Sequence, residues 1–241
     1  MKLVKYIANL GYGSRRDVMR MLDDGRVTRT DGSELEEGEE IAHEDILVDG
    51  EPLDPSPASI LILHKPVGYV CSTGGSERLI YELLPDRLRV RSPVMAPIGR
   101  LDLETSGLLL LTDDGQVNHR ITSPRTHLPK IYEVELANDL TGNEAREFAS
   151  GTMLLESETE PLKPAQLHVI DNRHVRLTLT EGRYHQVRRM FAAVGNHVVS
   201  LHRAAMGDLH LGALGAGEWR VISPDERSLL GLPGVSSPKE P

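Results

Sequence analysis

The chain has 241 residues, of which 39% are hydrophobic, so it is long enough for one or two domains with a sizeable core. No apolar segment approaches the ~18–20 residues of a membrane-spanning helix, and nothing resembles a secretory signal, which favours a cytoplasmic protein that does not bind a membrane. Cys71 is the single cysteine, which excludes an intramolecular disulfide framework, and the ten scattered histidines show no metal-ligand spacing.

The net charge of −9 weighs against a nucleic-acid partner, but the charges are unevenly distributed. Residues 1–30 carry seven Lys/Arg and three Asp/Glu, whereas residues 31–54 carry eleven Asp/Glu and no Lys/Arg. Residues 119–130 and 181–203 are also locally basic. Binding to a polyanion depends on the local potential more than on the total charge. The acidic balance therefore weakens a nucleic-acid interpretation without excluding it.

Residues 1–54 are predicted to form a small separate domain. Helical spacing of apolar residues runs from Leu3 to Leu10 and ends at Gly11. A second helix begins at Ser14, where Asp17 completes a capping-box pattern, and ends at Gly25. Short strands follow near residues 27–30 and 46–48, next to Asp-Gly turns.

This pattern resembles the S4 RNA-binding domain. The resemblance rests on residues 5–8, 13–16, 25–27 and 45–50, although the acidic stretch at residues 28–40 lacks the Val-Asn-Gly hairpin common in such domains. It implies that Arg15, Arg16 and Arg20 on the second helix contact RNA. The alternative is that these arginines form an ordinary solvated helix face.

A proline-rich linker at residues 55–59 separates this domain from a catalytic domain at residues 60–225, and residues 226–241 are expected to be a C-terminal tail.

Strand and helix signals alternate in the second domain. The pattern predicts an α+β fold with a mixed, largely antiparallel sheet. The expected strands lie at residues 60–64, 108–111, 131–136, 167–170, 175–179, 198–201 and 219–222. The expected helices lie at residues 79–84, from Asp113 or Asp114 to about 121, 141–151, 184–194 and from Pro224 onward.

The segment at residues 99–107 combines charge and glycine immediately before the most apolar run in the sequence. In an extended segment Arg100 and Asp102 leave the same face, at the edge of a strand buried on both sides. One interpretation is an ordinary ion pair, and the other is a reactive carboxylate held at a fixed position. Gly107 is expected to permit a close backbone approach or an unusual dihedral angle.

Four segments together are similar to the RsuA family of pseudouridine synthases. They are residues 65–69, 99–115, 130–132 and 181–190, in that order behind the S4-like domain. The resemblance implies isomerisation of a uridine in rRNA, without a metal or any other cofactor. It further implies that Asp102 is the catalytic residue, that Arg188 pairs with it, and that Tyr132 stacks against the uracil.

Other residues are carried over from the same resemblance. Arg100 matches the arginine that holds the target nucleotide out of its helix, and Lys65, Arg189 and Leu201 are expected to bind the substrate. Further RNA contacts are expected from three arginines of the basic segments. These are Arg120, Arg125 and Arg183.

Alternative functions remain at this stage. Residues 184–186 and 118–125 resemble the 16S rRNA enzyme more than its 23S relatives, so a 23S target is the second choice. A non-catalytic rRNA-binding assembly factor would keep the fold without the chemistry. A hydrolase could use Asp102 and Glu104, which share a face in an extended segment. The chain shows no coiled coil and is expected to be a monomer.

Overall fold

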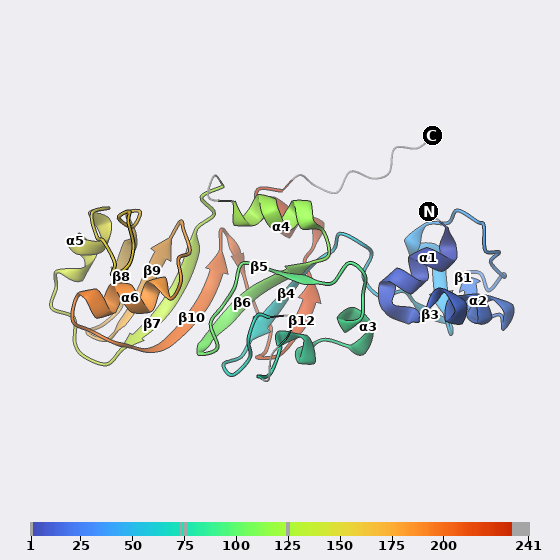
Figure 1. The fold of residues 1–241 in the computed structure, drawn as a ribbon, viewed down its shortest axis with the longest axis horizontal. Coiled ribbons are helices and arrows are strands. Elements are labelled where there is room, and N and C mark those ends of the chain that lie inside the picture. Colours follow the sequence, from blue (N-terminus) through green and yellow to red (C-terminus); the bar gives the residue numbers. More distant parts are fainter. Residues whose placement is uncertain (1, 73, 75–76, 124–125, 233–241) are drawn as a thin grey trace.

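The computed structural model describes residues 2–72, 74, 77–123 and 126–232. The molecule is elongated, with a small N-terminal unit at one end and a larger unit built on a twisted sheet (Figure 1). Within the described residues, no helix is long and apolar enough to cross a membrane.

The N-terminal unit begins with two helices, as expected. Its helices are α1 (Leu3–Ile7), a π-helical turn (Ala8–Tyr12) and α2 (Arg15–Asp23). The predicted end of the first helix at Gly11 is confirmed, because Gly11 has φ 98° and interrupts the helical backbone within the π-helical turn. The capping box is confirmed: Ser14 Oγ accepts the Asp17 N–H, and the Asp17 carboxylate accepts the Ser14 N–H.

Three short strands complete this unit. They are β1 (Val27–Arg29), β2 (Ile46–Val48) and β3 (Glu51–Pro52), paired antiparallel in that order. Apolar side chains from helices and strands form a core separate from that of the large sheet. Its most buried members are Leu3, Ile7, Val18, Val27 and Ile46. A short 3-10 turn, His43–Asp45, precedes β2.

The large sheet has the order β12-β4-β6-β10-β7-β9-β8 among the described residues. Its strands on this path are β4 (Ile60–Lys65), β6 (Thr105–Thr112), β7 (Lys130–Leu136), β8 (Gln166–Val169), β9 (His174–Leu179), β10 (Val198–Met206) and β12 (Trp219–Val221). The pairing of β6 with β10 is parallel and the other named pairings are antiparallel, so the sheet is mixed.

Strand β6 is an interior strand of this sheet and is buried on both faces. Leu109 and Leu111 belong to one core, and Leu108 and Leu110 belong to the core on the opposite face. All four leucines have an exposed fraction of 0%. The prediction of a strand buried on both sides is therefore confirmed, and this strand gives the adjacent segment a rigid support.

One edge of β6 is shared by two strands. Strand β4 pairs with residues 107–112 on the other edge of β6. Strand β5 (Ala96–Ile98), opposite residues 110–112, and β10, opposite residues 105–107, therefore lie on the same side of β6. The connection from β5 to β6, residues 99–104, lies at this split. Residues 99–104 therefore leave the sheet between β5 and β10, while the leucines of β6 stay buried.

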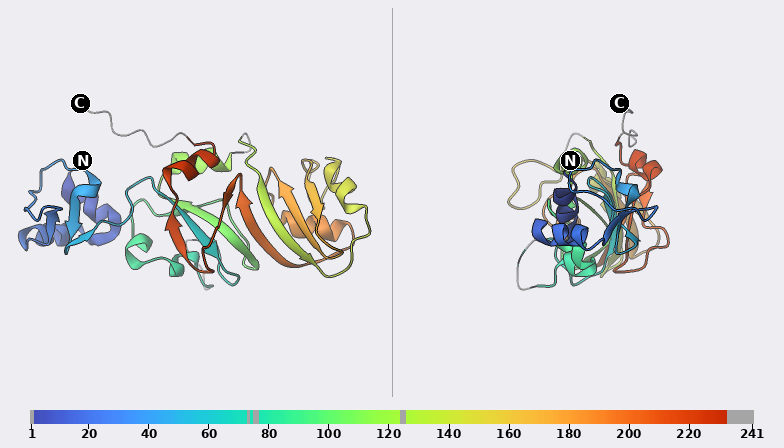
Figure 2. Two further views of the ribbon diagram at one scale, coloured as in Figure 1. Left: turned by 180° about the vertical axis from the view of Figure 1, so that it is seen from behind. Right: turned by 90° about the vertical axis from the view of Figure 1, so that its right-hand side faces the viewer.

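Helices cover both faces of the sheet (Figure 2). They are α3 (Asp86–Arg89), α4 (Gly115–Thr122), α5 (Glu144–Ala149), α6 (Gln186–Ala193) and α7 (Pro224–Leu229), and a 3-10 turn lies at Ile80–Leu83. The short strand β11 (Leu209–His210) pairs with the end of β10. The buried face of α6, formed by Val187, Met190 and Phe191, packs on one core as predicted. Ile121 of α4 belongs to the opposite core.

Two helix starts differ from the predictions. Helix α5 begins at Glu144 and not at Thr141, because the buried Glu144 carboxylate accepts the N–H groups of Thr141 and Gly142 and folds that segment into a turn. Helix α6 begins at Gln186 and not at Tyr184, because His185 has a left-handed backbone with φ 49°. Asp114, one of the two predicted caps, does begin α4. The tail beyond residue 232 lies outside the described residues.

The two units are joined by specific contacts around the linker. Arg87 of α3 pairs with Asp54 through both oxygens of the carboxylate, and its guanidinium lies 4.8 Å from the centre of the Tyr12 ring. The Ala58 N–H donates to Asp113 Oδ1 at 2.7 Å. Asp113 in turn pairs with the buried Arg91 at 2.8 Å. The linker is therefore held against the larger unit and does not behave as a free tether.

Candidate active site

A cavity of about 480 Å³ lies beside the split edge of β6. Residues 99–102 and 179–187 form much of its wall, together with side chains of β7 and β10, Thr105 and the residues at 122–123. This volume falls within the ~300–1,000 Å³ typical of ligand sites. Three segments that are distant in sequence therefore meet at one cavity.

Asp102 lies in this wall, with its backbone fixed and its carboxylate partly exposed. Its carbonyl oxygen accepts hydrogen bonds from the Thr105 N–H at 3.0 Å and from Lys65 Nζ at 3.1 Å. The next carbonyl, that of Leu103, accepts the Gly68 N–H at 2.8 Å. The Asp102 side chain is 31% exposed. The loop is thus held through its backbone, and the carboxylate remains accessible.

Arg100 also lines the cavity, but it does not pair with Asp102. Its side chain is exposed, and within the described residues it has no hydrogen-bond or ion-pair partner. The ordinary ion-pair interpretation of these two residues is therefore wrong. A guanidinium with no anionic partner at the edge of a cavity remains available to bind an anion such as a phosphate.

Lys65 does not reach the cavity, contrary to its prediction as a substrate-binding residue. Its side chain is fully buried, and Nζ donates to the carbonyl oxygens of Pro66, Asp102 and Thr105. Burial lowers the pKa of Lys65 from its ordinary 10.5 to about 8, and the nearby Arg203 lowers it further, whereas Cys71 and Asp102 oppose the shift. Lys65 therefore positions the Asp102 loop from behind.

Arg188 does not pair with Asp102, so this prediction was wrong. Its guanidinium donates to the carbonyl oxygens of Val198 and Glu104, at 3.1 and 3.2 Å, and lies 3.8 Å from the Glu104 carboxylate. These contacts tie α6 to β10 and to the end of the β5–β6 connection. Arg188 therefore supports the wall of the site and is not the partner of its carboxylate.

Arg189 and Arg183 are held mainly by acidic and carbonyl groups of the same lobe. Arg189 donates to Glu158 at 2.9 Å and to the carbonyls of Glu156 and Tyr184. Arg183 lines the cavity, but it pairs with Glu158 at 3.0 Å and with Glu181 at 3.4 Å. The substrate contact predicted for Arg189 is not supported by this position, since its donors are committed to the protein.

Tyr132 and Leu201 do line the cavity, as the resemblance implied. Tyr132 is on β7 and Leu201 is on the neighbouring strand β10, and both are largely buried, with exposed fractions of 9% and 5%. Both side chains belong to the core that supports α6. They provide an apolar wall whose packing leaves little freedom to move.

Three residues of the site were missed by the sequence interpretation. Arg203 is 1% exposed, donates from Nε to the Leu108 carbonyl, and keeps Nη2 buried without a partner among the described residues. Lys130 lines the cavity, and burial together with Arg203 lowers its pKa. Arg203 is on β10 and Lys130 is on β7. The sequence alone does not show which face of a strand a single basic side chain is on, so neither residue was predicted to line the cavity.

His185 is the third of these residues. Its Nε2 lies 3.4 Å from Asp102 Oδ1, which is the shortest ion-pair distance to that carboxylate among the described residues. The left-handed backbone at His185 turns the side chain toward the cavity just before α6 begins. The sequence pattern predicted a helix at His185, and that expectation concealed this contact.

The expected role of Gly107 is confirmed. Its φ is 112°, and a Cβ built there would lie 2.3 Å from the carbonyl oxygen of Arg203. Only glycine lets β6 and β10 approach this closely while keeping that backbone conformation. The pairing of these strands brings Leu201 and Arg203 to the cavity.

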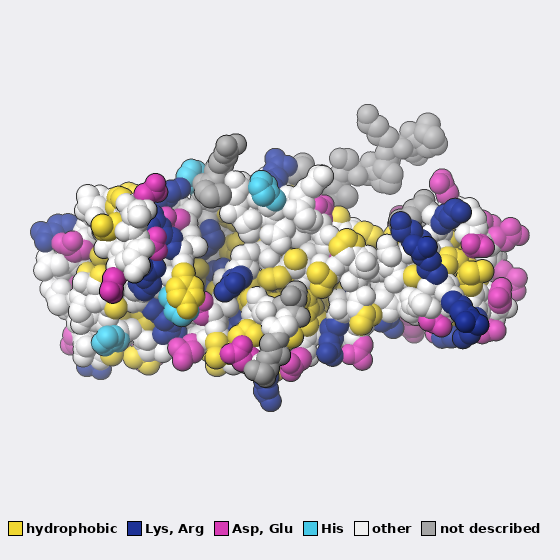
Figure 3. Space-filling view, in the orientation of Figure 1, with side chains coloured by type: hydrophobic (Ala, Val, Ile, Leu, Met, Phe, Trp, Pro, Cys, Tyr) yellow, Lys and Arg dark blue, Asp and Glu magenta, His cyan; other side chains and the backbone are white. Residues whose placement is uncertain are grey.

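The predicted RNA-contacting arginines outside the cavity are on the surface. Arg15, Arg16 and Arg20 are exposed on α2, and Arg120 is exposed on α4. Arg125 lies outside the described residues. Figure 3 shows Lys and Arg side chains near α6 and again on the N-terminal unit, on the same side of the molecule.

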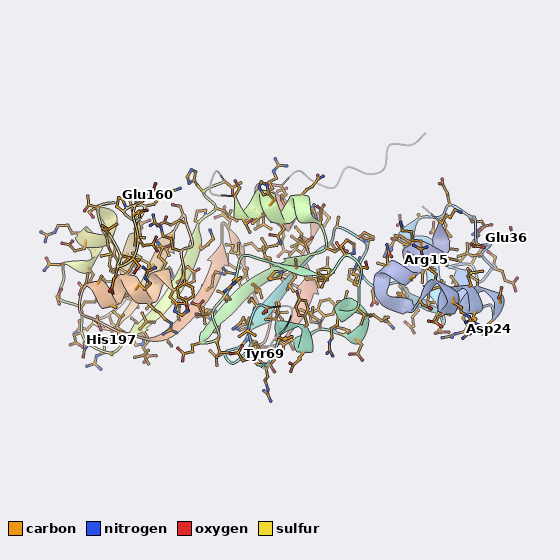
Figure 4. All side chains as sticks on the ribbon, viewed as in Figure 1. Arg15, Asp24, Glu36, Tyr69, Glu160 and His197 are labelled. Carbon is orange, nitrogen blue, oxygen red and sulfur yellow. The ribbon has the colours of Figure 1, made fainter. Side chains whose placement is uncertain are left out.

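Basic and acidic side chains lie next to each other on the N-terminal unit, where Arg26 pairs with Asp49 and Arg29 pairs with Glu39. Figure 4 shows Arg15 on the side nearer the large sheet and Glu36 at the outer end of the molecule. Glu36, a member of the acidic stretch, therefore lies on the side of this unit away from the large sheet. Within the residues that the structure describes, no group of three His, Cys, Asp or Glu side chains is arranged to hold a metal ion.

Comparison with known proteins agrees with this geometry. The sequence profile of the RNA pseudouridylate synthase family matches residues 59–193. The chain is 42% identical to a protein of Yersinia pestis named ribosomal small subunit pseudouridine synthase A, over 97% of this chain and 99% of the relative. The protein of the same name from Escherichia coli strain K12 is 43% identical, over 94% and 98%.

A solved structure supports the fold over nearly the whole chain. It is a crystal structure of a pseudouridylate synthase, superimposed with a TM-score of 0.68 at 39% identity. The match covers 95% of this chain and 99% of that one.

Proposed function

The chain belongs to the RsuA family of RNA pseudouridylate synthases, and we propose that it converts one uridine of 16S rRNA to pseudouridine with Asp102 as the catalytic residue. The relatives named above are small-subunit enzymes, and 16S rRNA is the RNA of the bacterial small subunit. This favours a 16S target over a 23S target.

The observation that carries the proposal is the accessible carboxylate of Asp102 in the cavity, whose side-chain contact among the described residues is His185 Nε2 at 3.4 Å. Glu181 is the other carboxylate in the wall, but it accepts hydrogen bonds from the Lys163 N–H and from Gln186 Nε2 and pairs with Arg183. Asp102 makes no comparable set of bonds to the protein. It is the carboxylate available to act on a substrate as nucleophile or base.

The reaction rearranges the uridine without any net change in composition. The bond between N1 and C1′ breaks, the uracil turns, and C5 bonds to C1′; C5 loses a proton and N1 gains one. A stacked uridine cannot present these atoms to a carboxylate, so the nucleotide must leave the RNA stack at a cost of a few kcal/mol. Tyr132 would contact the extruded uracil, and the unpartnered Arg100 would contact the phosphate backbone.

A hydrolase based on Asp102 and Glu104 is less well supported. Glu104 is exposed and lies near Arg188, and it is not among the residues that line the cavity. The two carboxylates therefore do not face a common substrate position, as a paired acid and base would have to do.

The N-terminal unit is proposed to act as an S4-like RNA-binding domain over residues 1–54, joined by the linker to the catalytic domain. Its two helices, its capping box and the exposed arginines of α2 support this assignment. We further propose a cytoplasmic location, a monomeric state and an rRNA partner that is bound either as naked rRNA or within an assembling ribosomal particle.

The test is a map of pseudouridines in 16S and 23S rRNA from cells with and without the gene. We expect one position of 16S rRNA to lose its pseudouridine, and the wild-type gene to restore it. A gene carrying Asp102→Asn should not restore it. Loss of a 23S position, or no loss at all, would contradict the proposal.

A further inference from the structure

Tyr184 is an aromatic side chain left in solvent at the edge of the cavity. Its exposed fraction is 69%, whereas the other five tyrosines are buried or half-buried. Aromatic residues make up only 4% of the chain. Leaving a large ring in water forgoes the stabilisation of burying it, so the position calls for a reason other than folding.

The ring of Tyr184 is held flat on a second ring. It stacks on the ring of His185 with a centroid distance of 3.9 Å and an interplanar angle of 15°. One face of Tyr184 is therefore covered, and the exposure of the residue places its other face in solvent. A flat aromatic face supported from behind is the arrangement on which unpaired nucleobases stack.

The backbone around this pair is fixed before any ligand binds. The Tyr184 carbonyl accepts a hydrogen bond from Arg189 at 3.2 Å, and the Arg183 N–H donates to the Gln186 side chain at 2.9 Å. Arg183 and Arg189 are both anchored on Glu158. Binding on such a prearranged surface requires little additional ordering.

The pair is also joined directly to the reacting group. His185 stacks under Tyr184 on one side, and its Nε2 lies 3.4 Å from the Asp102 carboxylate on the other. A base lying on Tyr184 would therefore be next to the nucleotide held at Asp102. The exposed Arg100 in the same wall could bind the phosphate that joins the two nucleotides.

We propose that the Tyr184–His185 ring pair is a stacking subsite for an unpaired nucleobase adjacent to the target uridine. The ligand is a purine or pyrimidine of the RNA substrate, bound through its π-face and not through base-specific hydrogen bonds. This inference rests on the proposed function, because it assumes an RNA whose uridine is bound at Asp102.

The test compares Tyr184→Ala and Tyr184→Phe with wild type on two RNAs. The first RNA is a short fragment of 16S rRNA that contains the uridine modified by the wild-type protein. The second carries abasic nucleotides on both sides of that uridine. Leu154→Ala serves as a control, because Leu154 is also an exposed apolar residue, 58% accessible, but it does not line the cavity.

On the first RNA, Tyr184→Ala is expected to raise KM roughly 5- to 150-fold, which corresponds to the loss of one base–aromatic stack, with a smaller effect on kcat. Tyr184→Phe, which keeps the ring, should stay within about threefold of wild type. On the abasic RNA the penalty of Tyr184→Ala should disappear, because the stacking partner is already missing.

Two results would overturn the subsite while leaving the proposed function intact. One is an unchanged KM for Tyr184→Ala on the intact RNA. The other is an equal loss on both RNAs, which would indicate a structural role for the ring. Failure of the wild-type protein to form pseudouridine would instead overturn the proposed function itself, and the subsite with it.

Discussion

Lys65 Nζ lies 3.1 Å from the carbonyl oxygen of Asp102 and is buried outside the set of residues that line the cavity. The same ammonium group binds the carbonyl of Thr105 at 2.7 Å, where β6 begins. One buried cation thus fixes the backbone on both sides of the turn that presents the carboxylate. The positive charge stabilises the position of the loop and does not occupy the site.

Replacing Lys65 with methionine should therefore reduce catalysis through position. The variant removes the Nζ donor from three carbonyl groups; the Asp102 carbonyl keeps the Thr105 N–H, whereas a buried carbonyl left unsatisfied costs about 1–3 kcal/mol in the free energy of unfolding. A displacement of Asp102 by about 1 Å is expected to lower kcat by about 10²-fold, with little change in the Kd for RNA. Single-turnover rates at saturating RNA measure the first effect, and filter binding measures the second.

Lys5→Met is the matched control, because Lys5 is an exposed lysine on α1. It should leave both kcat and stability close to wild type. An equal loss of kcat in the control, or a normal kcat in Lys65→Met, would contradict the positioning role.

The lowered pKa of Lys65 also predicts a pH dependence of stability. The pKa is about 8 in the folded protein and 10.5 ordinarily, so between these values the unfolded chain holds more protons than the folded one. The free energy of unfolding should therefore rise with pH in this window, by up to about 1.4 kcal/mol per pH unit from this group. Denaturant titrations of wild type and Lys65→Met from pH 7 to 10.5 would isolate it, since the variant should lack this contribution.

Asp102→Asn should abolish pseudouridine formation and keep RNA binding. A reduction of at least about 10²–10⁴-fold in rate is expected when the acting carboxylate is removed. Glu104→Gln is the matched control, because Glu104 is two residues away, exposed and outside the cavity wall. The hydrolase interpretation predicts that both variants lose activity, so measuring both rates on one rRNA transcript separates the two functions.

Gly107→Ala should lower the free energy of unfolding by more than an alanine at a positive φ does where no atom is nearby. The added Cβ would lie 2.3 Å from a backbone oxygen of β10, which cannot move without breaking the sheet. Gly142→Ala provides the comparison, since Gly142 has φ 91° and nothing within 4 Å of its Cβ position. We expect about 1 kcal/mol for Gly142→Ala and more than about 3 kcal/mol for Gly107→Ala by chemical denaturation. Similar values for the two would mean that the strands separate easily.

Charge reversal on α2 should weaken RNA binding through its salt-dependent component. Arg15 and Arg16 are exposed and form no ion pair among the described residues. Replacing both with glutamate should raise the Kd for rRNA and make the slope of log K against log salt less steep, by about 0.7–0.9 for each phosphate that the protein no longer neutralises. The rate at saturating RNA should stay within a few-fold of wild type.

Arg146→Glu is the control for this experiment. Arg146 is an exposed arginine on α5, at the end of the molecule opposite α2 (Figure 1). It should change the Kd by much less than the α2 variant. An equal effect of the two would mean that binding responds to total charge and not to the N-terminal helix.

Much of the fold could be predicted from local patterns. The continuous apolar run at residues 108–111 indicated a strand buried on both faces, and the spacing of Val187, Met190 and Phe191 indicated the buried face of α6. The capping box of α2 depends on residues three positions apart. These features depend on neighbours in sequence, so the chain encodes them directly.

The contacts of the site depended on the tertiary structure. Sequence similarity brought Asp102 and Tyr132 to attention, but it assigned Arg188 to the carboxylate and Lys65 to the substrate, and the folded chain directs Arg188 to Glu104 and buries Lys65 behind the loop. His185 reaches Asp102 because its backbone is left-handed where a helix was expected. The sequence determines which charged groups are present. The pairing of strands far apart in the chain determines which of these groups lie close together, because ion pairs and hydrogen bonds form only over short distances.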